Sequence, residues 1–177
     1  PVARQWAEDQ PAVMAYMLKD TEEPIRQLAL DLARQRLEDD LPFDVPLRDA
    51  VRSRLEDRSA QLRREAALLL RDLSDELAAG LVALRLAGGH ELSVSVLRAY
   101  LLMMARLPRR EAVEPALSFL AEDNLRGEAA AALAAALDRG LLSRKQASRA
   151  AQQVRRDLDN QRLPPPQVVT LLGKPNV

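Results

Sequence analysis

The feature that most constrains this chain of 177 residues is a short pattern that recurs in a fixed register. Counting from Asp57, an aliphatic residue stands at the fifth position, Arg at the sixth, Ala at the ninth and Leu at the twelfth. Counting from Asp20, the same offsets reach Ile25, Arg26, Ala29 and Leu32. A pattern that returns after 37 residues, from position 20 to position 57, predicts a stack of similar supersecondary units.

Two further copies are less complete. Leu125-Arg126-Gly127-Glu128-Ala129 keeps the aliphatic, Arg and Ala positions, whereas the copy that begins at Val96 has Leu97 in place of the Arg. Apolar residues at offsets 0, 4, 7 and 11 lie on one face of a helix, and Val96, Tyr100, Met103 and Leu107 follow this spacing. Each copy therefore predicts an amphipathic helix whose apolar face needs a neighbouring unit to cover it.

The Asp loop, the aliphatic-Arg pair and the following Ala and Leu resemble the HEAT repeat, including the shorter HEAT-like units that are common in bacteria. The resemblance covers roughly residues 11–138. It implies units of two antiparallel helices, with the pattern at the start of the second helix. We therefore expect an all-α fold, a right-handed α-solenoid of about four helix pairs with flanking helices. The expected domains are a repeat array at 1–140 and a C-terminal region at 141–177.

Local signals predict the helix ends. Pro11 is expected to start the first helix of the array, and Gly88-Gly89 to end the third unit's first helix. Ser143 and Gln146 have capping-box spacing before a basic helix at about 144–160. Pro164-Pro165-Pro166 should end that helix, and a short apolar helix at 168–172 should follow. The predicted N-caps are Thr21, Asp44, Ser59, Ser74 and either Asp123 or Asn124.

The recurrent arginines Arg26 and Arg63 are expected to have a structural role, pairing with the loop Asp of their own or a neighbouring unit. The opposite side of the second helices carries a different set of polar residues. It forms a discontinuous basic stripe on the face that would be concave in a solenoid: Gln27, Arg34, Arg64, Arg71 and Arg98. The stripe has two interpretations, an ordinary solvated helix face or a groove for an acidic partner segment.

A second basic feature lies near the C-terminus. Residues 139–162 hold seven basic and two acidic residues, a net charge of +5, whereas residues 1–88 hold 13 basic and 17 acidic residues, a net charge of −4. The basic helix contributes Arg144, Lys145, Arg149, Arg155 and Arg156. This asymmetry could orient the protein on a membrane surface or nucleic acid, or serve contacts within the chain. Aromatic residues that would stack on bases are missing among these basic residues.

The sequence contains one histidine, His90, and no cysteine. A single His without Cys does not supply an ordinary zinc site, so His90 is expected to be a loop residue, and no metal or cofactor is expected. No phosphate-binding glycine loop or nucleophile triad is present, and we predict that the chain is not an enzyme. The overall balance of 26 basic and 26 acidic residues argues against a dedicated nucleic-acid binder.

These observations favour a non-catalytic protein-interaction or scaffold module that binds a protein partner, with an acidic segment as one option. The alternatives are a nucleic-acid-binding HEAT-like domain and a regulatory domain of a membrane protein. No run of 18 apolar residues predicts a membrane span within this sequence. The cytoplasm is the favoured compartment. We expect the chain to be a part of a longer protein, and the oligomeric state is left open.

Overall fold

A computed structural model describes residues 2–159, with helix backbone alone at 2–9 and 157–159. Every regular element in this part of the chain is helical, which confirms the all-α fold class. The chain forms two compact units, 1–73 and 74–177. The predicted Pro-rich break and the apolar helix at 168–172 lie outside the described residues.

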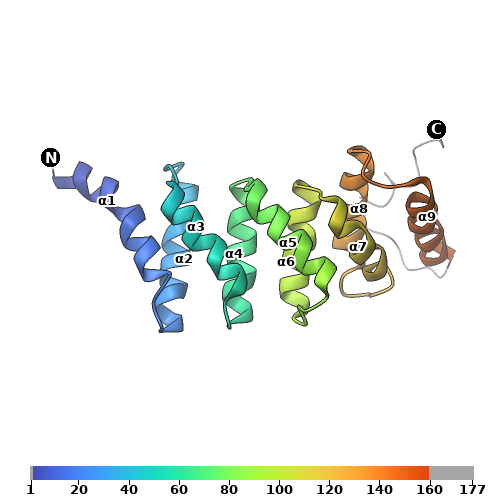
Figure 1. The fold of residues 1–177 in the computed structure, drawn as a ribbon, viewed down its shortest axis with the longest axis horizontal. Helices are drawn as coiled ribbons and strands as arrows, with labels where there is room; N and C mark the ends of the chain where they lie inside the picture. The colour runs from blue at the N-terminus through green and yellow to red at the C-terminus, as the bar shows by residue number, and fades with distance from the viewer. Residues whose placement is uncertain (1, 160–177) are drawn as a thin grey trace. The chain divides into compact units, whose positions relative to one another are not determined.

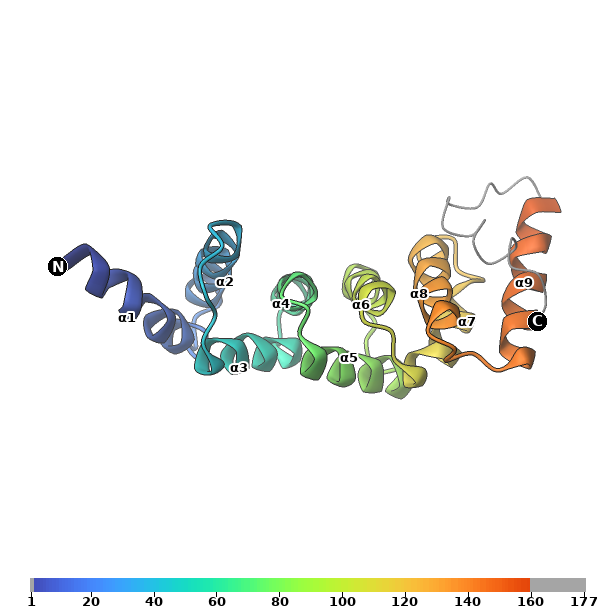
Figure 2. The same cartoon turned by 90° about the horizontal axis from the view of Figure 1, so that it is seen from above.

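The first unit has two layers of helices. It consists of α1 (Val2–Met17), α2 (Glu23–Glu38), α3 (Val45–Ser53), a 3-10 turn η1 (Arg54–Glu56) and α4 (Ala60–Asp72). Within this unit, α1 and α3 lie in one layer and α2 and α4 in the other (Figure 2). Apolar residues of the repeat pattern, among them Ala29, Leu62 and Ala66, are completely buried between the layers. The pattern therefore marks much of the core of the first unit, but its prediction is wrong at Leu32, which is 39% exposed.

The second unit repeats the two-layer arrangement and adds a terminal helix. It consists of α5 (Glu76–Gly88), α6 (Val94–Arg106), a 3-10 turn η2 (Arg110–Ala112), α7 (Val113–Phe119), α8 (Arg126–Asp138) and α9 (Arg144–Asp159). Within this unit α6 packs along α8, α5 contacts α6 and η2, and α9 contacts α7 (Figure 1). Tyr100 and Met103, predicted core residues of the degenerate copy, are completely buried.

Several helix ends agree with the sequence. Asp44 is the N-cap of α3, where its carboxylate accepts a hydrogen bond from the Leu47 backbone N–H at 2.9 Å. The Ser143 and Gln146 side chains form the predicted capping box at the start of α9. Gly89 ends α5 in the left-handed conformation, with φ of 67°, which glycine adopts without steric penalty.

Other predicted helix ends are wrong. Helix α1 continues through Pro11, whose ring is buried, because burial of the helix outweighs the one backbone hydrogen bond that proline cannot donate. At the start of α5, Asp75 caps the helix instead of Ser74, since the buried carboxylate accepts from the Ala78 backbone N–H at 2.9 Å. The N-cap of α2 is Glu22 rather than Thr21, and that of α8 is Leu125 rather than Asp123 or Asn124.

Candidate interaction surface

A buried ion pair in the first unit joins the start of α2 to the loop before α4. The Arg26 guanidinium donates to both carboxylate oxygens of Asp57, from Nε at 2.8 Å and from Nη2 at 3.0 Å. Its Nη1 donates to the backbone carbonyls of Asp20 and Thr21. The Arg26 and Asp57 side chains are only 10% and 2% exposed. This arrangement confirms the predicted structural role of Arg26, and we call it the Arg26–Asp57 clasp.

Electrostatics keeps both members of the clasp charged. Burial opposes ionisation of Asp57, but hydrogen bonds from Arg26 and from the Ser59 backbone N–H, with attraction to Arg26 and Arg54, lower its pKa below the ordinary value. The pKa of Arg26 is raised, chiefly by its hydrogen bond to Asp57. The clasp therefore remains a salt bridge at neutral pH.

The recurrent arginine has the same backbone geometry in other copies of the pattern. Arg63 donates to the carbonyl of Asp57, six residues before it, at 2.8 Å, and Arg126 donates to the carbonyl of Leu120, also six residues before, at 3.0 Å. Arg26 and the carbonyl of Asp20 have this spacing as well. The arginine thus closes the loop before the second helix in the three copies that contain it.

Sequence reasoning missed the loop acid of the degenerate copy. In two loops, the carboxylates of Asp20 and Asp57 accept from the backbone N–H two residues later, at 2.8 and 3.0 Å. Glu91 does the same with the Ser93 backbone N–H, at 2.9 Å. The spacing in the sequence could have identified Glu91 as this loop acid. Glu91 stands five residues before Val96, as Asp57 stands five residues before Leu62.

The predicted stripe in the first unit contains both signs of charge. Arg34 on α2 reaches Glu65 at 3.3 Å and Asp72 at 3.9 Å, both on α4. Arg71 also contacts Asp72, at 2.7 Å, and Arg64 contacts Glu65. The structure therefore brings Arg34, Arg64 and Arg71 together, but through two carboxylates that bridge them. We call this set the α2–α4 charged surface.

The remaining stripe residues also have partners. On α2, Gln27 donates to Asp31 at 2.9 Å. In the second unit, Arg98 contacts Glu128 at 3.0 Å and donates to the backbone carbonyl of Asn124. The acidic members were missed because the prediction followed one residue type. Three of these acids had positions that were visible in the sequence. Glu65 and Asp72 each follow an arginine directly, and Asp31 stands one helical turn after Gln27.

The basic helix α9 docks on α7 through one part of its polar face. Arg149 and Gln146 reach the Glu114 carboxylate at 2.9 and 2.8 Å. These bonds, first that from Gln146 and then that from Arg149, lower the pKa of Glu114. The other predicted residues of this helix, Arg144, Lys145, Arg155 and Arg156, are exposed. Only Arg149 of the predicted set is thus committed to a contact with α7 that positions the helix.

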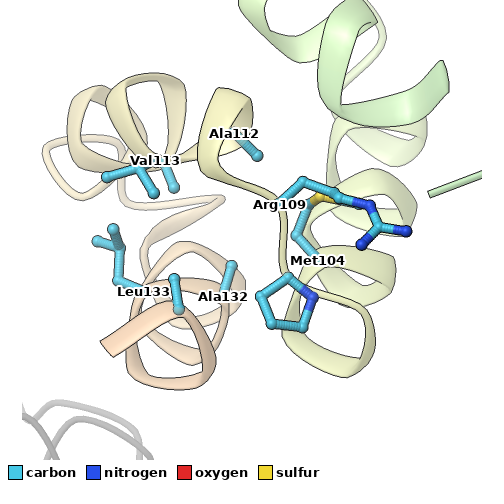
Figure 3. Close-up of a pocket in the computed structure, with 9 residues that line it drawn as sticks. Met104, Arg109, Ala112, Val113, Ala132 and Leu133 are labelled. Carbon is cyan, nitrogen blue, oxygen red and sulfur yellow. The ribbon is translucent and has the colours of Figure 1, made fainter. Parts of the chain in front are cut away.

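Two hollows in the second unit were considered as ligand sites. The first, between α6, α7 and α8, is lined by apolar side chains and by Arg109, and Figure 3 shows Val113 and Leu133 pointing toward one another across it. Its volume of about 10 Å³ is enough for a single water molecule. The second, about 230 Å³, is an open depression beside α9 whose lining includes Arg149 and Arg156. Neither has the enclosed shape of a small-molecule site.

Within residues 2–159, no cluster of three or more His, Cys, Asp or Glu side chains could hold a metal ion. His90 lies exposed between α5 and α6, as predicted for a loop residue. None of the helices described has the length and apolar character needed to cross a membrane. Comparisons with protein-family models, with curated proteins and with solved structures found no match for this chain.

Proposed function

We propose that this chain is a non-catalytic protein-interaction module whose partner binds the second helices of the repeated pairs. The observation that carries the proposal is the α2–α4 charged surface, where accessible arginines and carboxylates lie over a buried apolar core. Arg34, Arg64 and Arg71 are 34%, 43% and 28% exposed in their side chains, so their guanidinium groups can exchange partners at the surface. Such surfaces favour specific association through charge complementarity.

The pairing within the surface defines the kind of partner that fits. A purely acidic segment would have to compete with Glu65 and Asp72 for the same guanidinium groups. A protein surface that presents both signs can instead match arginines and carboxylates together. A charged surface of both signs also offers little net attraction to phosphates, which supports a protein partner over nucleic acid.

The proposal includes the solenoid architecture that the repeat resemblance implies. Two layers within each unit, with second helices on one side, support stacking of such pairs into a right-handed α-solenoid. In that architecture Arg98 on α6 would belong to the same class of surface residues.

The test is a nuclease-treated affinity purification of the tagged protein from its own cells, in three parallel forms. The forms are the wild type, the double variant Arg64→Glu/Arg71→Glu, and the control Arg155→Glu/Arg156→Glu. The control makes the same charge change on exposed arginines of α9. We expect a protein partner that is recovered with the wild type and the control and lost with the first variant.

Two results would contradict the proposal. Recovery of the same proteins with all three forms would show that the α2–α4 charged surface only contacts solvent and does not bind the partner. Loss of the partner in the α9 variant alone would move the function to the basic helix. A parallel purification without nuclease separates a protein partner from one that is bridged by nucleic acid.

A further inference from the structure

Helix α5 presents an apolar face to solvent. Leu77, Leu81 and Leu84 are 67%, 47% and 62% exposed, and their spacing of four and three residues places them on one side of the helix. Gly80 lies among them, and the space above its Cα is open, with nothing within 4 Å of where a Cβ would stand. We call these four residues the α5 stripe. The inward face of α5, which includes Ala79 and Val82, is buried, so the part of the helix between Glu76 and Arg85 is apolar all round.

The first helices of the other pairs expose fewer large apolar side chains, which are Val13 and Tyr16 of α1 and Val45 of α3 among the described residues. In α3, Val45 is 68% exposed at the first position, whereas the exposed and half-buried positions after Pro46 are polar ones such as Asp49, Arg52 and Ser53. In α7, the exposed positions are Glu114 and Ser118, and Glu114 is used by α9. A helix that is apolar on every side is normally covered on every side, and a run of exposed leucines marks an interaction surface. We therefore expect a binding partner to cover the α5 stripe.

The charges at the two ends of the stripe indicate which occupant fits. Glu76 precedes the stripe by one residue, and Arg85 follows it by one residue. A two-fold axis that passes between Gly80 and Leu81 would place Glu76 of one copy opposite Arg85 of the other. The same axis would place Leu77 opposite Leu84. Leu81 would lie opposite Gly80, where the missing side chain leaves room for it.

We propose that the α5 stripe is the docking site for a second copy of this chain, with the two α5 helices antiparallel. The surface is self-complementary in shape, apolar content and charge, as an interface with two-fold symmetry requires. A lipid surface is the competing occupant. The flanking charges disfavour it, because helices that lie on membranes carry mainly Lys and Arg beside their apolar face, whereas this stripe is bordered by one acid and one base. The inference is independent of the α2–α4 charged surface.

Sedimentation equilibrium of the 177-residue chain tests the proposal over a range of concentrations. We expect the wild type to form a dimer and Leu81→Lys to shift the equilibrium to the monomer, with a Kd at least about tenfold weaker, because a charge at the centre of an apolar interface loses its hydration. The matched control is Leu92→Lys, which alters a leucine that is 88% exposed in the loop before α6 and outside the stripe. It should leave the Kd unchanged. Thermal unfolding followed by circular dichroism checks that both variants fold.

A charge exchange tests the antiparallel register. Glu76→Arg and Arg85→Glu should each weaken self-association about tenfold, since each turns two symmetry-related attractive pairs into repulsive ones. An equimolar mixture of the two variants should associate as tightly as the wild type, because every pair again joins opposite charges. The Glu76 carboxylate also bonds Arg109 of its own chain, and the mixture separates that local effect from the contact between copies, since mixing cannot repair it.

Several outcomes would overturn the proposal. One is a wild type that stays monomeric at every concentration. Another is a dimer that Leu81→Lys leaves intact or that Leu92→Lys weakens equally. A third is a monomer that sediments with vesicles of phosphatidylcholine and phosphatidylglycerol, and loses this binding in Leu81→Lys. That result would assign the stripe to a membrane surface. Failure of the mixture to restore association would refute the antiparallel register.

Discussion

The two units hold adjacent second helices together by different chemistry. In the first unit, the loops before α2 and α4 are joined by the Arg26–Asp57 clasp, and Arg34 adds contacts from α2 to α4. In the second unit, α8 packs along α6 through a largely apolar surface, to which Arg98 adds a contact with Glu128, and no ion pair corresponds to the clasp among the contacts described above. The position that corresponds to Arg26 is there occupied by Leu97, which is 8% exposed.

Small residues make the second arrangement possible. Helix α8 buries a set of small and apolar side chains: Ala129, Ala130, Ala132, Leu133, Ala134 and Ala136. They lie in the same unit as the large buried side chains of α6, which include Tyr100, Met103 and Met104. The degenerate copy has thus lost the arginine that forms the clasp. It keeps the helix pair because apolar packing of small against large residues takes the place of the ion pair.

The two units should differ more in their sensitivity to mutation and acid than in their total free energy of unfolding. A buried salt bridge contributes little net stability relative to apolar packing, yet removing one partner leaves an uncompensated charge. We therefore expect the first unit to respond sharply to single polar changes and to acid. The second unit should respond chiefly to changes in volume.

The largest effect is expected from Asp57→Ala. It should lower the free energy of unfolding of the first unit by about 3–5 kcal/mol, because the Arg26 guanidinium remains buried without its partner. Urea unfolding followed by circular dichroism measures this loss. The matched control is Asp49→Ala, at an exposed carboxylate paired with Arg52, which should cost less than about 1 kcal/mol.

A double variant sharpens this prediction. Arg26→Met/Asp57→Leu removes both charges and should be less destabilised than Asp57→Ala alone. If the double variant loses more free energy of unfolding than Asp57→Ala, the clasp contributes net stability and our interpretation of it is wrong.

A smaller effect is expected from Ala132→Leu in the second unit. Ala132 lines the hollow beside Met104 and Val113, whose volume of about 10 Å³ cannot take the added side-chain atoms. Overpacking should cost about 1–3 kcal/mol, measured by urea unfolding with circular dichroism. Ala131→Leu, at a half-buried position of the same helix, should be close to neutral. Equal losses in the two variants would show that α8 does not pack closely at Ala132.

Acid should weaken the first unit through Asp57. Its pKa is lowered in the folded state, so the stabilisation is fully present above the ordinary value of 3.8 and is lost as the pH falls through the lower folded value. The effect should be smaller than that of Asp57→Ala, since the protonated carboxyl still forms hydrogen bonds. Urea midpoints from circular dichroism, measured down to pH values below 3.8, should fall more steeply for the wild type than for Asp57→Asn. Parallel curves would exclude Asp57 as the source.

The smallest effect is expected from Arg34→Ala. This arginine is partly exposed, and its pairs with Glu65 and Asp72 are screened by solvent. The variant should lose less than about 1 kcal/mol in the urea assay. A loss near that of Asp57→Ala would mean that the α2–α4 charged surface holds the unit together, and would argue against its availability to a partner.

The sequence by itself determined the helical class, the helix faces and the recurring loop. Periodicity fixed these features because the residues on one side of a helix are set by their spacing alone. The clasp was foreseeable for the same reason, since Arg26 and the loop Asp recur at constant offsets. Likewise, Asp44 and the Ser143–Gln146 pair cap their helices through contacts only three residues apart.

Only the tertiary structure decided which groups meet across larger separations. The carboxylate that Arg34 reaches lies 31 residues away, and no local pattern names it. Helix α1 continues through Pro11, and Asp75 displaces Ser74 as a cap, because burial outweighs local preference at both places. The α5 stripe is the clearest case. In a helix that is apolar all round, periodicity cannot tell the inner face from the outer one, and only the neighbours packed against it decide which leucines remain in water.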